Sequence, residues 1–369
     1  MTSKITYHGI GLMSGSSLDG LDIALCKVDL DLKSKSVKMD LLQADCVAFP
    51  TDLQDQLAQG PQLELRSFLE LDATLGQFMA AAVHQFLERA PEIKVDFIAS
   101  HGHTIIHDPV KGYSCQIGSA AQLAAQTGLT TISDFRNIDI ALGGQGAPMA
   151  PLIDQVLYHA DVCVNIGGIA NLSYSNGAQR VGFDFAPANQ LLNYLSAKLG
   201  SAYDDQGKIA QSGQVHDSLL QAMLEVPMIV AAAPKSFDNT ELQTVFLPIL
   251  NQSNISIADQ LATCVELIAI TFKHCMEDLK KVGTFDTPLK VLFTGGGAKN
   301  DFLIHRMMEL CSLDITRVKI SAEESDMKEA MLMVLAGVYR LSGMPNLLSS
   351  VTGSAEDNMG GAVYQAKAK

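Results

Sequence analysis

Residues 11–25 read GLMSGSSLDGLDIAL, and the interpretation of the whole chain starts from this stretch. Apolar residues flank a centre rich in glycine, serine and aspartate, which is typical of two β-strands joined by a turn. A tight hairpin needs only one glycine or an Asn-Gly pair. Residues 15–20 hold more small and polar residues than that. Glycine-rich turns after strands can bring backbone N–H groups close to a phosphate.

A second stretch has the same organisation. Residues 161–174, DVCVNIGGIANLSY, again place glycines between two apolar arms, and alternating strand and helix patterns follow both stretches. This predicts an α/β protein of two similarly built domains with a cleft between them, although the halves are too dissimilar to count as a sequence repeat. We expect domains 1–150 and 151–369, with the last helix packing back on the first domain as an alternative.

The composition predicts a well-cored globular protein and excludes some partners. Of 369 residues, 47% are hydrophobic and 18% are charged, which is enough for two domains. The net charge of −14 argues against nucleic acid or an anionic membrane surface as a partner, because both attract an excess of Lys and Arg. No apolar run reaches the roughly 18 residues of a membrane span.

Cysteine usage and the N-terminus predict a location. The seven cysteines are scattered and include no CxxC pair, which favours buried thiols in a reducing compartment over a disulfide framework. The opening MTSKITYHGIGLM has no long apolar region and therefore does not resemble a signal peptide. We expect a cytoplasmic protein.

Helical and strand patterns alternate along both halves. Helical periodicity covers residues 63–90, 256–281 and 325–343. The short apolar strand VDFIAS ends at Ser100, and a polar group, residues 101–104, follows it. In α/β sheets, ligands bind just past the carboxyl ends of strands.

Three glycine-rich loops adjoin apolar strands, at residues 15–20, 167–168 and 295–297. Any one of them is more often a bulge or a tight bend than a ligand site. Their recurrence in one chain favours phosphate binding.

Several polar side chains are candidates for chemistry, each with a structural alternative. Asp19 or Asp22 would hold Mg²⁺ through water, or would stabilise the turn. Arg136 offers a fork of N–H groups to a sugar carboxylate or phosphate, or makes a salt bridge between domains. Asp184 suits a general base held by a rigid turn, or caps a helix that starts near Asn189.

The histidines at positions 101, 103 and 107 resemble a metal cluster only superficially. Zinc sites rarely have this spacing without cysteine or a further ligand. We expect His101 and His103 to form hydrogen bonds or line the cleft.

Together, these motifs resemble the 1,6-anhydro-N-acetylmuramic acid kinase family over nearly the whole chain. The matching segments, in order, are GLMSGSSLDGLD (11–22), SHGHTIIH (100–107), QIG (116–118), SDFRNIDIALGGQGAP (133–148), NIGGIANLS (165–173), APKS (233–236), FTGGGAKN (293–300), KEA (328–330) and NLLSSVTG (346–353).

The resemblance implies the two-domain ATPase fold of actin, sugar kinases and Hsp70, with a cleft between the domains. It also implies a reaction that uses ATP and Mg²⁺. A base-activated water attacks the anomeric carbon of the anhydro sugar and opens the 1,6 bridge, and the freed O6 takes the γ-phosphoryl group. The product is N-acetylmuramic acid 6-phosphate, in the recycling of peptidoglycan. Family members are usually homodimers.

The resemblance also assigns site residues. Asp184 falls on the catalytic base, and Arg136, Gln145 and Glu329 fall on positions that face the sugar. Asp19 is the implied metal ligand. The positions implied for ATP are Gly15, Ser16, Ser17, Leu18, Asp19, Gly20, Leu21, Asp22, Gly167, Gly168, Gly295, Gly296, Gly297 and Asn300.

The chain departs from the family pattern around the base. The family motif D-T-G-P-G-N is replaced by Asp-Phe-Ala-Pro-Ala-Asn over residues 184–189. Phe185 would either raise the pKa of Asp184 by desolvation or narrow the sugar pocket. Ser119 stands where the family has Asp, and Phe-Asp-Asn-Thr follows Ser236 where the family has T-G-R-E. These changes leave two alternatives open, a kinase for another sugar or a non-kinase nucleotide-binding regulator or chaperone-like protein of the actin/Hsp70 superfamily.

Overall fold

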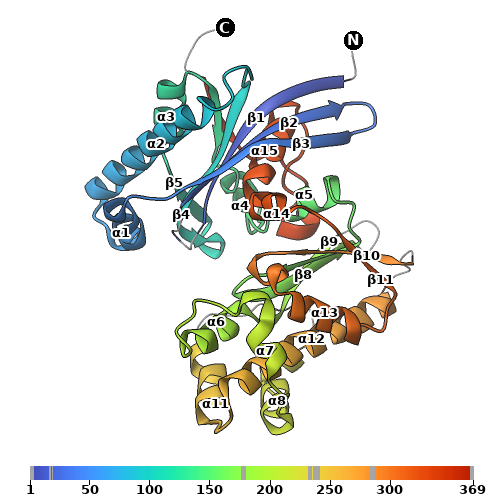
Figure 1. The fold of residues 1–369 in the computed structure, drawn as a ribbon. Coiled ribbons are helices and arrows are strands. Elements are labelled where there is room, and N and C mark those ends of the chain that lie inside the picture. The colour runs from blue at the N-terminus through green and yellow to red at the C-terminus, as the bar shows by residue number, and fades with distance from the viewer. Residues whose placement is uncertain are drawn as a thin grey trace. The chain divides into compact units, whose positions relative to one another are not determined.

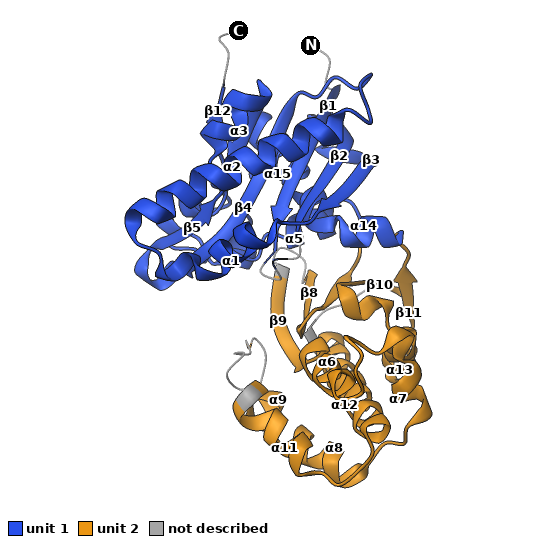
Figure 2. Ribbon diagram, turned by 60° about the vertical axis from the view of Figure 1, so that its left-hand side comes forward, with its two compact units in different colours: residues 1–158, 321–369 blue, residues 159–320 orange. Residues whose placement is uncertain are grey.

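The computed structural model describes residues 4–15, 18, 20–175, 180–231, 235, 242–282 and 287–365. The chain forms two compact units, which Figure 2 colours blue and orange. Unit 1 is residues 1–158 with 321–369, and unit 2 is residues 159–320.

Unit 1 is built around one mixed sheet with the strand order β3-β2-β1-β4-β6-β12, and β5 pairs with β4 at one end. The β1–β2 and β2–β3 pairs are antiparallel, whereas β1–β4 and β4–β6 are parallel. The strands are β1 (Lys4–Ser14), β2 (Leu21–Asp31), β3 (Ser36–Val47), β4 (Phe97–Asp108), β5 (Tyr113–Ile117), β6 (Thr130–Ser133) and β12 (Ala362–Tyr364).

Helices cover both faces of this sheet (Figure 1). Alternate side chains of β2 divide between the faces, so that Ile23 and Leu25 pack with α2 and α3, while Ala24 and Cys26 pack with α15. The helices are α1 (Thr51–Gln59), α2 (Leu65–Leu87), α3 (Ala120–Thr127), α4 (Asn137–Ala141), α5 (Pro151–Val156), α14 (Ala322–Asp326), α15 (Lys328–Leu341) and α16 (Ser349–Thr352).

Unit 2 repeats this arrangement with the strand order β9-β8-β7-β10-β11. The β7–β8 and β8–β9 pairs are antiparallel, and the β7–β10 and β10–β11 pairs are parallel. The strands are β7 (Val162–Ile166), β8 (Ile169–Ser175), β9 (Arg180–Pro187), β10 (Leu289–Thr294) and β11 (Ile315–Val318). The same order and directions in both units confirm the expectation of two similarly built α/β domains.

One hydrophobic core joins the sheet of unit 2 to its helices. The long helix α12 (Ile257–Val282) lies at its centre and contacts β9, α6, α7, α8 and α13. The other helices are α6 (Asn189–Ala197), α7 (Lys208–Ser212), α8 (Asp217–Leu224), α9 (Pro227–Val230), α11 (Leu247–Gln252) and α13 (Asp301–Leu310), and a π-helical segment (Leu242–Phe246) precedes α11.

The C-terminal segment belongs to unit 1, in agreement with the alternative that the last helix packs back on the first domain, and not with a second domain of residues 151–369. The physical reason is α15, which is buried over most of its length and packs against β1, β2 and β4. The strand β12 then adds to the edge of the same sheet beside β6.

One local expectation needs correction. The strand that begins with VDFIAS does not end at Ser100 but continues as β4 to Asp108, because β5 pairs with its second half. Asp22 follows the turn, as expected, and lies within β2 opposite Met13. In the described part of the chain, no helix is long and apolar enough to span a membrane.

Candidate active site

The first glycine-rich turn connects β1 to β2, as expected. Ser16, Ser17 and Asp19 lie outside the described residues. Leu18 has a positive φ of 59°, and its carbonyl accepts a hydrogen bond of 2.8 Å from the Gln54 side chain.

Both ends of this turn are held by the sheet. A Cβ on Gly20 would lie 2.8 Å from the Val47 carbonyl oxygen, so packing alone requires glycine there. Leu21 is fully buried and begins β2, opposite Ser14. Gly15 accepts a hydrogen bond of 3.3 Å from the backbone N–H of Leu18.

The second glycine-rich turn connects β7 to β8 and contacts the start of α6. The Gly168 carbonyl accepts the N–H of Ala188 at 2.9 Å, and the Gly167 carbonyl accepts that of Asn189 at 3.0 Å. A Cβ on Gly167 would have no neighbour closer than the Ile169 carbonyl oxygen at 3.5 Å. Packing therefore does not require glycine at position 167.

The loop of residues 295–297 packs directly on this second turn within unit 2. A Cβ on Gly297 would lie 2.2 Å from Ile166 Cγ2, and one on Gly295 would lie 2.7 Å from Asn165 Oδ1. At Gly296 the nearest atom is Asn189 Nδ2 at 3.4 Å. The structure thus brings two of the three predicted loops together, with Asn189 between them.

Asn189 also bonds to the strand before the second turn. Its Nδ2 donates to the Ile166 carbonyl at 3.1 Å. Asn300, the last predicted residue of the 295–300 segment, caps α13 by accepting the Leu303 N–H at 2.9 Å. Asn300 therefore has a structural role in addition to the one that the resemblance implies.

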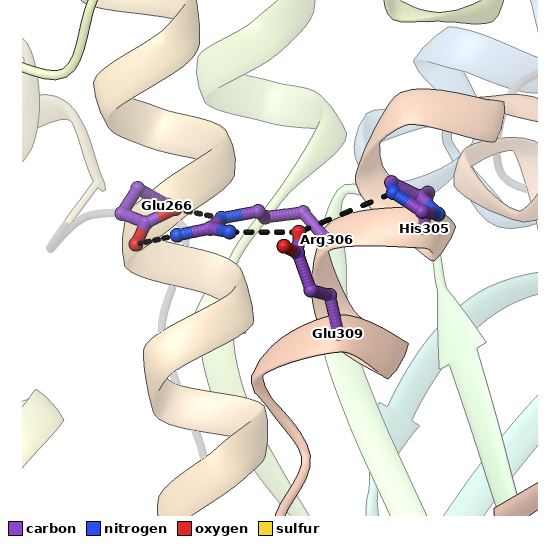
Figure 3. A network of polar contacts seen from close by, with 4 residues as sticks. All are labelled: Glu266, His305, Arg306 and Glu309. Atoms are coloured by element: carbon purple, nitrogen blue, oxygen red, sulfur yellow. Dashed lines mark hydrogen bonds and ion pairs between the residues drawn. The ribbon is translucent and has the colours of Figure 1, made fainter.

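Helix α13, which follows this loop, is joined to α12 by an ion pair between Arg306 and Glu266 (Figure 3). Arg306 donates to both carboxylate oxygens of Glu266, at 2.6 and 2.9 Å, and to Glu309 at 2.8 Å. These carboxylates raise the pKa of Arg306. A two-point bond of this kind fixes orientation as well as distance.

Asp184 lies within β9, beside a β-bulge. Asn171 pairs with Asp184 while Ala170 pairs with Ala186, so that Phe185 is the extra residue. Bulges often re-aim a side chain next to a functional site. The alternative that Asp184 caps the following helix is wrong, because the residue before α6 is Ala188.

The backbone of Asp184 is held from outside the sheet. Its N–H donates to the Lys235 carbonyl at 2.9 Å. The Lys235 ammonium in turn donates to the carbonyls of Met228 and Ile229, at 3.0 and 2.6 Å, near the end of α9. Our reading of the sequence gave Lys235 no role, although the APKS motif contains it.

The three residues that depart from the family pattern beside Asp184 are all fully buried: Phe185, Ala186 and Ala188. Phe185 is fully buried in the core of unit 2, with its ring 6.2 Å from that of Phe272. Its bulk therefore fills the core, and the expectation that it narrows a sugar pocket is wrong. Ala186 has no positive φ, whereas Ala188 combines a φ of −129° with a ψ of −104°, which lies outside the α and β regions. The changed segment after Ser236 lies outside the described residues.

The residues predicted to face the sugar all belong to unit 1. Arg136 precedes α4, and its Nε–H donates to His101 Nε2 at 3.0 Å while Nη1 donates to the Gly146 carbonyl at 3.2 Å. Burial lowers the pKa of Arg136, and the carboxylate of Glu329 opposes this shift. These partners all lie in unit 1, as Arg136 does.

Gln145 lies in the glycine-rich loop 141–148, which a buried carboxylate organises. Its side chain is exposed, and its backbone N–H donates to the Thr352 carbonyl at 2.8 Å. Asp139 accepts the Gly146 N–H at 2.7 Å and is fully buried. A Cβ on Gly144 would lie 2.2 Å from the Asp139 carboxylate.

The three histidines of β4 take separate partners. His101 contacts Arg136, His103 Nδ1 lies 2.9 Å from Ser14 Oγ, and His107 Nδ1 lies 2.9 Å from Ser114 Oγ. Within the part of the chain that is described, no group of three or more histidine, cysteine, aspartate or glutamate side chains could hold a metal.

Comparison with known proteins shows the family of this chain. The family model for anhydro-N-acetylmuramic acid kinase matches residues 7–366. The chain belongs to this family. Named members of the family from Hydrogenovibrio crunogenus and Pasteurella multocida are each 33% identical to it, over 96% and 98% of this chain and 97% of either relative. A member from Coxiella burnetii is 34% identical over 96% of both chains.

Membership in the anhydro-N-acetylmuramic acid kinase family confirms the resemblance drawn from the motifs. The observed fold is α/β, with two sheets of matching strand order, as expected for the two domains. The solved structure of a xyloylose kinase from Brucella ovis covers 93% of this chain and 92% of its own, with a TM-score of 0.45 and 10% identity.

Proposed function

We propose that this protein is an ATP-dependent kinase that opens 1,6-anhydro-N-acetylmuramic acid and phosphorylates its O6. The observation that carries this proposal is the family match over residues 7–366. The product would be N-acetylmuramic acid 6-phosphate, in the recycling of peptidoglycan. The sequence around the base differs from the family pattern, but Phe185 packs into the core, which supports an unchanged acceptor.

In this proposal Asp184 is the general base. Its carboxylate takes a proton from water while the water oxygen bonds to the anomeric carbon, and the bond between that carbon and O6 breaks. O6 then bonds to the γ-phosphorus of ATP, and ADP leaves with the electrons of the broken P–O bond. The bulge at Phe185 and the bond to the Lys235 carbonyl support a fixed position for this base.

ATP would be bound by the three glycine-rich segments. At positions 167 and 296 packing leaves room beside the backbone, which supports the approach of a ligand there. Mg²⁺ would enter with the nucleotide, since it keeps several waters and takes few carboxylates, and it would neutralise charge on the phosphates. Asp19 is the proposed protein contact to this hydrated ion.

The sugar would be held by Arg136, Gln145 and Glu329. The guanidinium suits a carboxylate, and the sugar acid carries one.

We also propose a cytoplasmic location, supported by seven cysteines that form no disulfide, and a homodimer, which rests on the family resemblance alone. Light scattering of the purified protein would test the dimer.

A coupled assay of ADP release tests the proposed function. The purified protein is given Mg-ATP with and without 1,6-anhydro-N-acetylmuramic acid. We expect ADP release that requires the sugar, and Asp184→Asn should lower it by about 10² to 10⁴-fold. Asp205→Asn, an exposed aspartate paired with Lys208 in the same unit, is the matched control and should leave the rate unchanged.

Two results would contradict the proposal. ADP release that does not depend on the sugar would favour a nucleotide-binding regulator. Sugar-dependent release that survives in Asp184→Asn would remove this residue as the base while leaving the kinase activity in place.

A further inference from the structure

The guanidinium of Arg136 is fixed by two neutral acceptors. Nε–H donates to His101 Nε2 at 3.0 Å, and Nη1 donates to the Gly146 carbonyl at 3.2 Å. Among the described residues, none accepts a hydrogen bond from Nη2. The two bonds therefore set the direction of the guanidinium and leave its Nη2 protons for a ligand.

The imidazole of His101 can hold this bond in only one tautomer. Because Nε2 accepts from Arg136, it carries no proton. The proton is on Nδ1, which lies 3.1 Å from the Gly102 carbonyl oxygen and donates to it. Burial and the positive charge of Arg136 lower the pKa of His101 to about 3, so the ring stays neutral near neutral pH.

The backbone of β4 next to His101 is closely packed. Gly102 has a φ of 73°, and a Cβ there would lie 2.4 Å from the Ile117 carbonyl oxygen. Its own carbonyl accepts the His101 proton, so the ring is set by the backbone of β4. His101 is only 6% exposed, which excludes water as a competing partner for most of the ring.

We propose that His101 is a positioning residue that aims the free edge of Arg136 at the carboxylate of an acidic anhydro sugar. This rests on the proposed function, and it adds a residue to which neither the resemblance nor our reading of the sequence gave a role in binding. A guanidinium without the His101 contact would keep its charge but lose its fixed direction. Loss of direction should weaken binding of the sugar acid more than binding of ATP.

Calorimetric titration of the sugar into the full-length protein with ADP present tests this without relying on turnover. We expect His101→Ala to raise the Kd for 1,6-anhydro-N-acetylmuramic acid by about 10- to 100-fold. The Kd for 1,6-anhydro-N-acetylglucosamine, which lacks the carboxylate, should change by less than about threefold. His101→Gln, whose amide can accept from Arg136 and donate to Gly102, should recover most of the affinity.

A double-variant cycle separates positioning from a general structural effect. If His101 acts through Arg136, then His101→Ala in an Arg136→Ala background should have no further effect on the Kd for the sugar acid. His107→Gln is the matched control, because His107 lies on the same strand but contacts Ser114. Circular dichroism confirms that each variant is folded, and His101→Leu, which fills the site but accepts no hydrogen bond, takes the place of His101→Ala if the alanine variant does not fold.

The outcomes distinguish this inference from the proposed function. An unchanged Kd in the variant that cannot accept from Arg136 (His101→Ala, or His101→Leu in its place), or additive losses in the cycle, would overturn the positioning role. If His101→Ala weakens binding of the sugar acid as expected, but the wild-type protein releases no ADP, the result would support the positioning role and contradict the kinase activity. A wild-type protein that binds no sugar would overturn both.

Discussion

The side-chain amide of Asn358 donates a hydrogen bond of 2.7 Å to the Asp139 carboxylate, across 219 residues of sequence. The same carboxylate accepts the Thr352 hydroxyl at 2.8 Å and the Gly146 N–H at 2.7 Å. Asp139 is fully buried, so these three donors replace its contact with water. One side chain therefore holds α4, the 141–148 loop and the C-terminal segment together.

Asp139→Asn should destabilise the protein by about 1–3 kcal/mol, because the amide presents N–H groups where donors already converge. Chemical denaturation monitored by circular dichroism measures this loss. Asp357→Asn is the control, since Asp357 also accepts hydrogen bonds in the C-terminal segment, from Ser349, but is exposed. An Asp139 variant as stable as the control would contradict the organising role of this carboxylate.

Gly297→Ala and Gly296→Ala should differ although the residues are neighbours. The alanine at 297 would place a methyl group 2.2 Å from Ile166 Cγ2, and we expect a loss of about 1–3 kcal/mol in thermal or chemical unfolding. At 296 the nearest atom is 3.4 Å away, so stability should change by less than about 0.5 kcal/mol. If the loop holds adenosine, Gly296→Ala should raise the KM for ATP. Equal stabilities of the two variants would show that the loop does not pack as described.

The ion pair between Lys328 and Asp154 should matter far more than an exposed pair. Their charged atoms are 2.6 Å apart, with side chains 9% and 4% exposed. Lys328→Met leaves a carboxylate in the interior, and we expect a loss of about 3–5 kcal/mol in unfolding free energy. Lys281→Met removes a pair of similar length, 2.7 Å, with side chains 75% and 73% exposed, and should cost less than about 1 kcal/mol. Similar losses for both would rule out a special contribution from burial.

Stability should fall as the pH is lowered from neutral, partly because of His101. Its pKa falls from 6.5 to about 3 on folding, so the unfolded state binds more protons between these values. The contribution of neutral His101 to the free energy of unfolding is therefore complete above pH 6.5 and is lost progressively as the pH falls towards 3. Burial lowers the pKa of His103 and His107 in the same direction.

Denaturation of wild type and His101→Gln at about pH 7 and about pH 5 measures this effect. Between the two conditions the variant should lose about 2 kcal/mol less than wild type, at about 1.4 kcal/mol per pKa unit. His84→Gln, at an exposed position on α2, should follow wild type. Parallel pH dependence in wild type and the His101 variant would contradict the shifted pKa.

The elements that sequence reasoning predicted are those set by local patterns. Both glycine-rich hairpins and the long helices α2 and α12 follow from periodicity and turn chemistry, which act over a few residues. Gly128 ends α3 at a positive φ of 70°, the backbone conformation in which glycine commonly ends helices. Family motifs then added the assignments of individual residues to the site.

The features that could not be predicted depend on pairing between distant segments. The continuation of β4 past Ser100 is stabilised by β5, and the bulge at Phe185 exists only in register with β8. The three donors to Asp139 come from positions 146, 352 and 358, which no local pattern connects. The contact of His101 with Arg136 likewise joins strand β4 to the residue before α4.

The return of the chain to unit 1 has a consequence for synthesis on the ribosome. Unit 2 is one continuous segment, residues 159–320, whereas unit 1 needs residues 321–369 as well. The buried side chains of α15, including Met331 and Val334, are part of the core beneath β2 and β4. The unit that begins first is therefore completed after unit 2, and the nascent sheet of unit 1 has one apolar face uncovered until α15 has been synthesised.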